Sequence, residues 1–319
     1  MRRSLAVAFV GLVAGVIAPG CGDHLGGGGA VDGTPAGTDA GPGADGPPAI
    51  DAGRDPVLDA RPYELYVPPS YQAGTPTPLV LMLHGYSANA DLQEVYFQLQ
   101  PEAEAKGFLY ARANGTVDPL GNRFWNATDA CCNLGHSAVD DVAYLRAVLD
   151  DIEARYTVDP KRVFVIGHSN GAFMAHRLAC DLSGRIAAIV TFAGDVWADA
   201  TKCNPTQPVS VLQIHGTFDA VIAYNGGQQI GMDGPYPAAP TTVAIWRAKN
   251  GCTGTMQGGR FDLTSDLPGD ESQLVEGTGC PAGGAVELMT VNGGGHVPVL
   301  KQPEFRDTVW DFFAAHPRP

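Results

Sequence analysis

The feature that most constrains this chain is the motif GHSNG at residues 167–171, which stands between a strand pattern and a helix pattern. Residues 162–166 (RVFVI) form a short apolar run typical of a buried strand, and residues 170–182 are helix-like. So sharp a strand-to-helix turn holds its serine in a strained backbone conformation and presents the hydroxyl above the sheet. The motif therefore predicts that Ser169 is a nucleophile, with a serine that merely caps the helix as the alternative.

Strand and helix patterns alternate along the chain from residue 58 onward. Strands are expected at residues 78–84, 108–113, 162–166, 186–192, 209–215 and 286–291, and helices at 92–105, 137–156, 170–182 and 304–315. Ser137 and Asp140 form a capping box for the second of these helices, and Asp159-Pro160 marks a turn before RVFVI. Apolar strands separated by helices predict an α/β protein with a mostly parallel central sheet and helices on both faces.

A serine hydroxyl needs a base, and the base needs a carboxylate that fixes its tautomer. Parallel sheets gather functional side chains at the carboxyl ends of their strands. His296 ends the stretch GGGH just past the strand at 286–291 and is the predicted base, with a surface-loop histidine as the alternative. Asp219 follows the strand at 209–215 and is the predicted acid, while Asp195, after the preceding strand, is its rival. Either choice gives the chain order Ser, Asp, His.

An acyl-transfer site also needs N–H donors for the oxyanion that forms on the attacked carbonyl. We expect one from the backbone of Asn170, which follows the serine, and one from the backbone of Tyr86, in the loop after the strand at 78–84. His84 is expected to brace this loop. Trp125 is a candidate for an aromatic wall against the substrate, together with Tyr86, and burial in the core is the equal alternative.

Six motifs are spread over residues 78–298: LMLHGY, Trp125-Asn126-Ala127 followed by Cys131-Cys132, VDDVAYL, GHSNGAFMAHRLAC, IHGTFD and GGGH. In these motifs the chain resembles the secreted esterases that include polyhydroxybutyrate depolymerases, feruloyl esterases and acetylxylan esterases (carbohydrate esterase family one and its relatives). The resemblance implies the α/β-hydrolase fold, places Ser169, Asp219 and His296 on the family's triad, and places the paired cysteines on its disulfide positions. Relatives often carry an aromatic residue after the catalytic histidine. This chain has Val297 there, a candidate substrate-binding residue, so the substrate preference is left open.

Six cysteines remain when Cys21, which ends the export signal described below, is set aside. They are Cys131, Cys132, Cys180, Cys203, Cys252 and Cys280. An even number in an exported chain indicates disulfides, and none of the spacings among Cys and His indicates a metal site. The last two lie in one glycine-rich region and are expected to pair. The adjacent first two would then pair with the middle two in an order that the sequence does not assign, with a bond between the two neighbours as the alternative.

The first 21 residues have the layout of an export signal. Arg2 and Arg3 precede a short apolar run, and small residues then lead to Cys21. This ending resembles the lipobox of bacterial lipoproteins, so Cys21 is a candidate for lipidation and membrane attachment, with an ordinary signal-peptide residue as the alternative. Residues 22–57 alternate Gly, Ala, Asp and Pro, which is typical of a flexible tether, and residues 58–319 remain as one catalytic domain.

Taken together, the sequence predicts an exported serine ester hydrolase, either secreted or held at the cell surface or in the periplasm. A formal net charge of −14 argues against nucleic acid as a partner. The expected chemistry is a two-step acyl transfer without cofactor or metal. Its substrates would be feruloyl or acetyl esters of polysaccharides, or short hydroxyalkanoate esters of the polyhydroxybutyrate type. A serine peptidase of the same fold is the alternative, and the oligomeric state is left open.

Overall fold

The computed structural model describes residues 55–319. The predicted export signal, the lipidation candidate Cys21 and the tether up to residue 54 therefore lie outside the described residues. Helix α1 (Pro56–Ala60) begins two residues before the predicted domain boundary at 58, because Asp55 caps it by accepting the N–H of Val57 at 3.0 Å. Leu58 of this helix is fully buried, so the folded domain includes the end of the predicted tether.

The domain contains eleven strands and seven α-helices within the described residues. The strands are β1 (Glu64–Tyr66), β2 (Thr77–Leu83), β3 (Leu109–Ala113), β4 (Thr116–Val117), β5 (Arg123–Phe124), β6 (Val158–His168), β7 (Ala188–Phe192), β8 (Ser210–Gly216), β9 (Gly254–Phe261), β10 (Ser272–Thr278) and β11 (Val286–Val291). The remaining helices are α2 (Ala90–Phe97), α3 (Gln100–Lys106), α4 (Asp141–Arg155), α5 (Asn170–Asp181), α6 (Ala239–Asn250), α7 (Glu304–Ala315) and the short 3₁₀ helix η1 (Ala200–Lys202).

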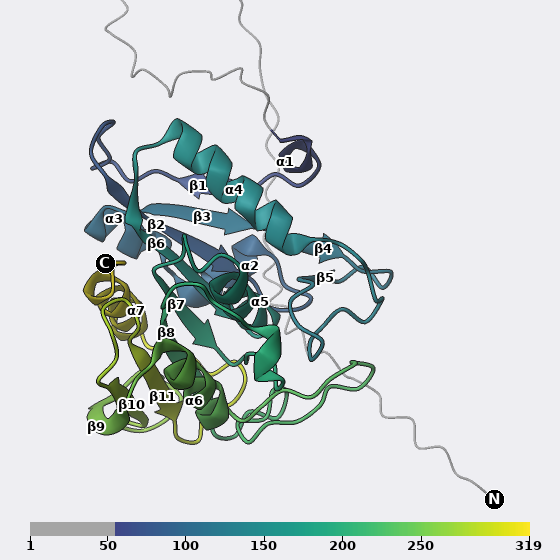
Figure 1. Cartoon of the computed structure of the whole chain (residues 1–319), viewed down its shortest axis with the longest axis vertical. Helices are drawn as coiled ribbons and strands as arrows, with labels where there is room; N and C mark the ends of the chain where they lie inside the picture. Colours follow the sequence, from purple (N-terminus) through teal and green to yellow (C-terminus); the bar gives the residue numbers. More distant parts are fainter. Residues whose placement is uncertain (1–54) are drawn as a thin grey trace, which may run out of the picture. The chain divides into compact units, whose positions relative to one another are not determined.

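Nine of the strands form one sheet in the order β1-β3-β2-β6-β7-β8-β11-β10-β9, which can be followed from the top to the lower left of Figure 1. The strands from β3 to β11 in this order are parallel, whereas β1, β10 and β9 pair antiparallel at the two edges. The predicted α/β class and mostly parallel sheet are confirmed. The carboxyl ends of the parallel strands meet at one edge of the sheet, where ligands bind in folds of this kind.

Helices cover both faces of this sheet, as predicted. Helices α4, α5 and α6 contribute to the core on one face, and α2, α3 and α7 to the core on the other. The alternation of side chains along β2 shows why: Leu81 belongs to the core under α4 and α5, whereas its neighbour Met82 belongs to the core under α3 and α7. A strand that is buried on both faces reads as a continuous apolar run, which is what made β2 recognisable.

Three local predictions are wrong in detail. The single helix expected at 92–105 is broken into α2 and α3, because Gln98 adopts a left-handed conformation (φ +52°) and a new helix starts at Gln100, with Pro101 in its first turn. Helix α4 begins at Asp141 rather than near Ser137, since its N-cap is Asp140, which accepts the N–H of Ala143 at 2.9 Å. The turn expected at Asp159-Pro160 is an irregularity in the pairing of β6 with β2 within a longer strand.

The disulfides follow the prediction only in part. Cys252 and Cys280 are bonded, as expected. The predicted pairing of the adjacent Cys131 and Cys132 with Cys180 and Cys203 is wrong: the two neighbours are bonded to each other, and Cys180 is bonded to Cys203. The Cα atoms of the latter pair are 5.1 Å apart, within the usual span of a disulfide, because the end of α5 lies against the segment that follows η1.

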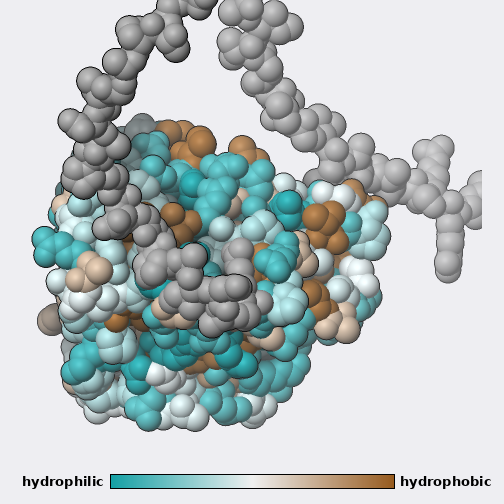
Figure 2. Space-filling view, turned by 90° about the horizontal axis from the view of Figure 1, so that it is seen from above, coloured by the Kyte–Doolittle hydropathy of each residue, from teal (hydrophilic) through white to brown (hydrophobic). Residues whose placement is uncertain are grey.

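On the face that Figure 2 shows, the visible surface of the described domain carries no continuous apolar belt. In the parts of the face visible in Figure 2, hydrophobic residues form separate patches between hydrophilic ones. Among residues 55–319, no helix is both long and apolar enough to cross a bilayer. Within the same range, no three or more His, Cys, Asp or Glu side chains are grouped so that they could hold a metal ion.

Candidate active site

Ser169 occupies a sharp turn between the end of β6 and the start of α5. Its backbone has φ +52° and ψ −121°, a conformation that side-chain-bearing residues adopt at a cost and usually only at functional positions. The N–H of Ser169 donates to the carbonyl of Phe192 on the neighbouring strand β7 at 2.8 Å, which holds the turn. The strained serine expected from the GHSNG motif is therefore present at the carboxyl edge of the sheet.

The glycines of the motif are required by close backbone contacts. A Cβ atom at Gly167 would lie 2.1 Å from the carbonyl oxygen of Gly171, and one at Gly171 would lie 2.2 Å from the carbonyl oxygen of Leu83. Any side chain at either position would therefore push α5 away from β2 and β6. This close approach fixes the position of the serine relative to the sheet.

His296 and Asp219 are in direct contact. The Nδ1–H of His296 donates to Oδ2 of Asp219 at 2.7 Å, and Oδ1 of Asp219 accepts the backbone N–H groups of Val221 and Ile222 at 2.8 Å each. Burial alone would raise the pKa of Asp219, but the hydrogen bonds from His215 and His296 hold it well below its usual range. The carboxylate is therefore charged and is fixed in orientation by its backbone donors.

The loops that carry Asp219 and His296 are bound to one another and to the rest of the site. The N–H of Phe218 donates to the carbonyl of Gly294 at 2.8 Å, next to the imidazole. The Nε2–H of His168 donates to the carbonyl of His296 at 3.0 Å, and the hydroxyl of Tyr96 donates to the carbonyl of Pro298 at 3.1 Å. Burial, reinforced by the charge of His296, lowers the pKa of His168 to about 3, so it remains neutral while it supports this loop.

A cavity of about 270 Å³ lies over Ser169. Its lining includes Ser169, His296, Tyr86, Tyr96 and Val297. The structure thus brings the predicted nucleophile, the predicted base and two further candidate residues to one pocket, with Asp219 behind the imidazole. Ser169 is only 7% exposed, whereas Val297 is 61% exposed at the rim.

The structure contradicts the prediction that Trp125 forms a wall of the substrate site. Trp125 is fully buried, and its indole N–H donates to the carbonyl of His84 at 3.0 Å. The side chain of Asn170 binds both backbone groups of Trp125, accepting its N–H at 2.6 Å and donating to its carbonyl at 3.0 Å. Trp125 therefore ties the loop after β2 to the start of α5. The burial of Trp125 depends on contacts with residues distant in the sequence, so it could not be predicted from the residues next to it.

His84 braces the loop that carries Tyr86, as expected. Its Nδ1–H donates to the carbonyl of Gly85 at 2.7 Å, and its Nε2 accepts the N–H of Gly115 at 2.9 Å. Burial lowers the pKa of His84 to about 4. The hydroxyl of Tyr86 donates to Asp118 at 2.7 Å, so both ends of this residue are fixed.

The rival acid Asp195 lies in a different environment. Its Oδ1 accepts the hydroxyl of Thr242 on α6 at 2.8 Å, and its Oδ2 has no hydrogen-bond partner among the described residues. Burial raises its pKa to about 6. The carboxylate that contacts His296 is that of Asp219, so the geometry favours Asp219 in the choice that the sequence left open.

A buried chain of hydrogen bonds behind the site was not predicted from the sequence. The indole N–H of Trp246 on α6 donates to Nδ1 of His176 on α5 at 3.0 Å. Because an indole N–H can only donate, His176 carries its proton on Nε2 and donates it to Oε1 of Gln213 at 3.1 Å. The hydroxyl of Thr191 donates to the same oxygen at 2.6 Å. The amide NH₂ of Gln213 is thereby turned toward the carbonyl of Gly194, at 2.9 Å.

This chain continues to Asp219. The NH₂ group of Gln213 also lies 3.3 Å from Nδ1 of His215, so this nitrogen accepts and the proton of His215 is on Nε2. That N–H donates to the carbonyl of Ile222 at 2.8 Å and lies 3.5 Å from Oδ2 of Asp219. His215 precedes Asp219 by four residues in the motif IHGTFD, which was the only signal for it in the sequence.

A strained serine at a strand-to-helix turn, on a mainly parallel sheet with helices on both faces, defines the α/β-hydrolase fold. Comparison with known proteins is more specific. The family described as "Esterase PHB depolymerase" matches residues 61–212. The chain is 31% identical over 248 residues to the "Putative esterase NocK" of Nocardia uniformis subsp. tsuyamanensis, covering 74% of this chain and 70% of that protein. The chain belongs to this esterase family.

Two further comparisons agree with this assignment. "Feruloyl esterase B" of Piromyces equi is 31% identical over 235 residues, which cover 72% of this chain but only 41% of that protein, so the chain spans less than half of this relative. The solved "Acetyl xylan esterase from Aspergillus awamori" superposes with a TM-score of 0.56 at 15% identity, covering 79% of this chain and 93% of that one. The latter likeness establishes the fold.

Proposed function

We propose that the chain is a serine carboxylic-ester hydrolase in which Ser169 is the nucleophile, His296 the general base and Asp219 the acid. The observation that carries the proposal is the 2.7 Å hydrogen bond between His296 and Asp219, beside a pocket that also contains the strained Ser169. Because Nδ1 of His296 donates to Asp219, its Nε2 is left as the acceptor, which is the tautomer that a general base requires.

The reaction would proceed in two acyl transfers. The Oγ atom of Ser169 attacks the ester carbonyl while Nε2 of His296 takes the hydroxyl proton, and a tetrahedral oxyanion forms. The oxyanion collapses, the alkoxide leaves with the proton from His296, and the acyl group stays on Ser169 as an ester. Water then attacks this ester by the same route and releases the acid. The negative Asp219 stabilises the imidazolium that forms in each step.

The proposed oxyanion donors are the backbone N–H groups of Asn170 and Tyr86. Asn170 is the first residue of α5, so its N–H lies at the positive end of the helix dipole. Tyr86 lines the same pocket as Ser169, and its loop is braced by His84. Losing one such donor typically lowers turnover by about 10²–10³.

The substrates that we propose are feruloyl or acetyl esters of polysaccharides, or short hydroxyalkanoate esters. The names of the similar proteins support this range: feruloyl esterase, acetyl xylan esterase and PHB depolymerase. Val297 stands exposed at the pocket rim, directly after His296, and we assign it to contact with the substrate. The pocket over Ser169 is small, which favours a short or flat acyl group there.

We further propose that residues 1–21 direct export, that Cys21 is lipidated and that residues 22–57 act mainly as a tether. The support is the sequence pattern alone. Expression of the full chain with radiolabelled palmitate, beside Cys21→Ala, tests the anchor. Label that is present in the parent and absent from the variant supports it, and label in both or in neither refutes it.

Hydrolysis by the purified, oxidised protein beside Ser169→Ala tests the proposed activity. The panel would contain p-nitrophenyl acetate, methyl ferulate, acetylated xylan, a 3-hydroxybutyrate oligomer and a peptide p-nitroanilide. We expect turnover of at least one ester that disappears in Ser169→Ala, with a burst of p-nitrophenol if deacylation is slow. Serine-dependent cleavage of the peptide alone would replace the proposal with a peptidase, and ester turnover that survives in Ser169→Ala would refute the role of the serine.

A further inference from the structure

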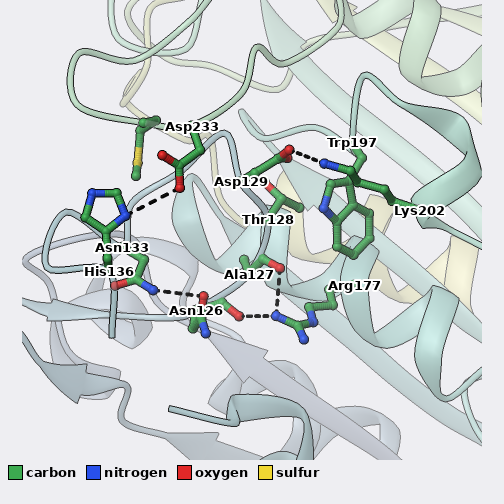
Figure 3. Close-up of a pocket in the computed structure, with 11 residues that line it drawn as sticks. Asn126, Ala127, Thr128, Asp129, Asn133, His136, Arg177, Trp197, Lys202 and Asp233 are labelled. Carbon is green, nitrogen blue, oxygen red and sulfur yellow. Dashed lines mark hydrogen bonds and ion pairs between the residues drawn. The ribbon is translucent and has the colours of Figure 1, made fainter. Parts of the chain in front are cut away.

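Two cavities lie beside α5, and they differ in how the polar side chains around them are satisfied. The larger, of about 390 Å³, is lined by the loop between β5 and α4, the middle of α5, the region of η1 and the loop before α6. Its charged side chains contact one another or the backbone: Lys202 is paired with Asp129, His136 contacts Asp233, and Arg177 donates to two backbone carbonyls (Figure 3). Within the described part of the chain, this cavity therefore presents charged side chains that already have partners.

The smaller cavity, over Ser169, contains a polar side chain that is only half satisfied. Gln93 on α2 lines this cavity and is only 3% exposed. Its Oε1 accepts the N–H of Gly85 at 3.2 Å, which fixes the end of the amide that carries the oxygen. Its Nε2 has no hydrogen-bond partner among the described residues. A buried amide nitrogen without an acceptor is costly, so a ligand that supplies an acceptor gains free energy.

The amide of Gln93 lies beside the proposed nucleophile. Gly85, whose N–H it accepts, packs directly against Ser169: a Cβ atom at Gly85 would lie 3.4 Å from Cβ of Ser169. Both Gln93 and Ser169 line the same cavity of about 270 Å³. An acyl group bound to Oγ of Ser169 would therefore share this small space with the amide.

The side chains around this amide are mainly apolar. Ala88, Leu92 and Val297 line the cavity with groups that neither donate nor accept a hydrogen bond. The hydroxyl of Tyr96, which also lines it, already donates to the carbonyl of Pro298 at 3.1 Å. In such surroundings an unpaired donor discriminates between ligands, because a ligand without an acceptor leaves the donor buried and unsatisfied.

We propose that Gln93 is a specificity-determining residue, whose Nε2 donates a hydrogen bond to an oxygen that the acyl group carries beyond its ester carbonyl. This role rests on the proposed function and narrows it. Acyl groups that bear a hydroxyl, ether or carbonyl oxygen near the ester are preferred over plain alkanoyl groups of the same size. An acetyl group has no such oxygen and leaves the amide of Gln93 unpaired.

Pairs of esters matched in size test this preference. p-Nitrophenyl methoxyacetate and butyrate differ only by an ether oxygen in place of a CH₂ group, and so do the 3-methoxypropionate and pentanoate. The ratio of kcat/KM, ether over alkyl, would be measured in the parent protein and in Gln93→Met, which keeps the length of the side chain but cannot donate. The intrinsic reactivity of each ester cancels between the two proteins. We expect the ratio to fall about tenfold in at least one pair, equivalent to the loss of one hydrogen bond.

The ratio separates recognition of the acyl group from support of the loop. Gln93→Met also removes the acceptor for the N–H of Gly85, and the loss of that support would lower kcat/KM for both esters of a pair equally. Gln98→Met, at an exposed position just past the end of the same helix, is the matched control and should leave the ratios unchanged. Ratios that do not change in Gln93→Met for either pair, or that fall equally in Gln98→Met, would overturn the role of Gln93.

Binding to the Ser169→Ala protein tests the contact without hydrolysis. The methyl esters of the same four acids would be titrated into the ¹⁵N-labelled full chain. The side-chain NH₂ signals of Gln93, identified by their absence when Gln93→Met is added, would be followed by NMR. We expect a saturable shift with an ether ester and a smaller shift with its alkyl partner, and equal shifts or none would contradict the contact.

The role of Gln93 and the proposed function can fail separately. Serine-dependent hydrolysis by the parent protein, with ratios that do not depend on Gln93, would remove the role of Gln93 and leave the esterase. A selective shift of the Gln93 signals by the ether esters, with no serine-dependent hydrolysis by the parent protein, would retain the contact and remove the esterase.

Discussion

Replacing Asp219 by Asn tests how the orientation of His296 is set. Oδ1 of Asp219 accepts two backbone N–H groups, from Val221 and Ile222, at 2.8 Å each. An Asn side chain keeps its oxygen at that position and turns its NH₂ group toward His296. The amide would then donate to Nδ1, which moves the imidazole proton to Nε2, on the side of Ser169. An Nε2 that carries a proton cannot take another from the serine.

The size of the effect follows from this tautomer exchange. The equivalent substitution in serine proteases lowers kcat by about 10⁴, which corresponds to ~5.4 kcal/mol of transition-state stabilisation at 1.36 kcal/mol per tenfold. We expect the same order for Asp219→Asn, because the two backbone donors leave the amide only one orientation. The assay is kcat/KM for p-nitrophenyl acetate across the pH range, with Ser169→Ala as the background rate.

Asp195→Asn is the matched control. Asp195 is as deeply buried as Asp219, but its hydrogen bond is to Thr242 and burial raises its pKa to about 6. Its replacement should change kcat/KM by no more than about tenfold, since no proton on His296 moves. A loss of less than tenfold in Asp219→Asn, or a loss near 10⁴ in Asp195→Asn, would refute the reasoning.

The remaining predictions concern the free energy of unfolding, measured in urea, and in one case also kcat. Burial and the charge of Glu276, its partner across the β10–β11 pair, raise the pKa of Glu287 from 4.5 to about 7, so the native state loses stability as the pH rises through this range. Glu287→Gln should therefore raise the free energy of unfolding by about 1–2 kcal/mol near pH 8 and by almost nothing near pH 4. An equal increase at the two pH values would exclude the charge of Glu287 as the cause. Replacing Cys180 and Cys203 together by Ala releases a crosslink of sequence separation 23 and should cost about 3 kcal/mol, and an unchanged midpoint would contradict this. Trp246→Phe removes the N–H that starts the buried chain and should cost about 1–3 kcal/mol and lower kcat for the small ester; if neither changes, the chain does not support the site.

The parts of the fold that could be predicted are those in which local pattern and burial agree. Strand β2 and helix α7 were found within one residue of their bounds, because a two-faced buried strand is apolar throughout and α7 buries one stripe that includes Phe305, Val309 and Phe313. The contact between Asp219 and His296 followed from topology: each side chain comes after a parallel strand, and β8 and β11 are neighbours in the sheet.

Other elements gave no such signal. Helix α6 contains Thr241, Thr242, Val243 and Ile245, β-branched residues that favour strands, and it is stabilised in the fold by the burial of Val243 and of Trp246. Strands β9 and β10 are the last two strands at one side of the sheet; β9 is mostly exposed, β10 is mostly half-buried, and both contain glycine, so neither shows an apolar run. Strand β10 pairs with β11, and β9 pairs in turn with β10, so the place of both strands in the sheet depends on β11.

The arrangement behind Asp219 shows why the partners of a site residue escape sequence analysis even when the signal for them is visible. Gln213 and His215 are two residues apart on β8, so both side chains point to the same face of the sheet. Two polar residues on one face of a buried strand must meet polar partners, because an unsatisfied polar group in a core is costly. Which partners they meet is decided by how α5 and α6 lie on that face, where they supply His176 and Trp246. The direction of each hydrogen bond then follows from the indole, which has a proton to donate and no lone pair to accept one. The position of the proton on His215, and hence the N–H that faces Asp219, is therefore set by Trp246, which lies on helix α6.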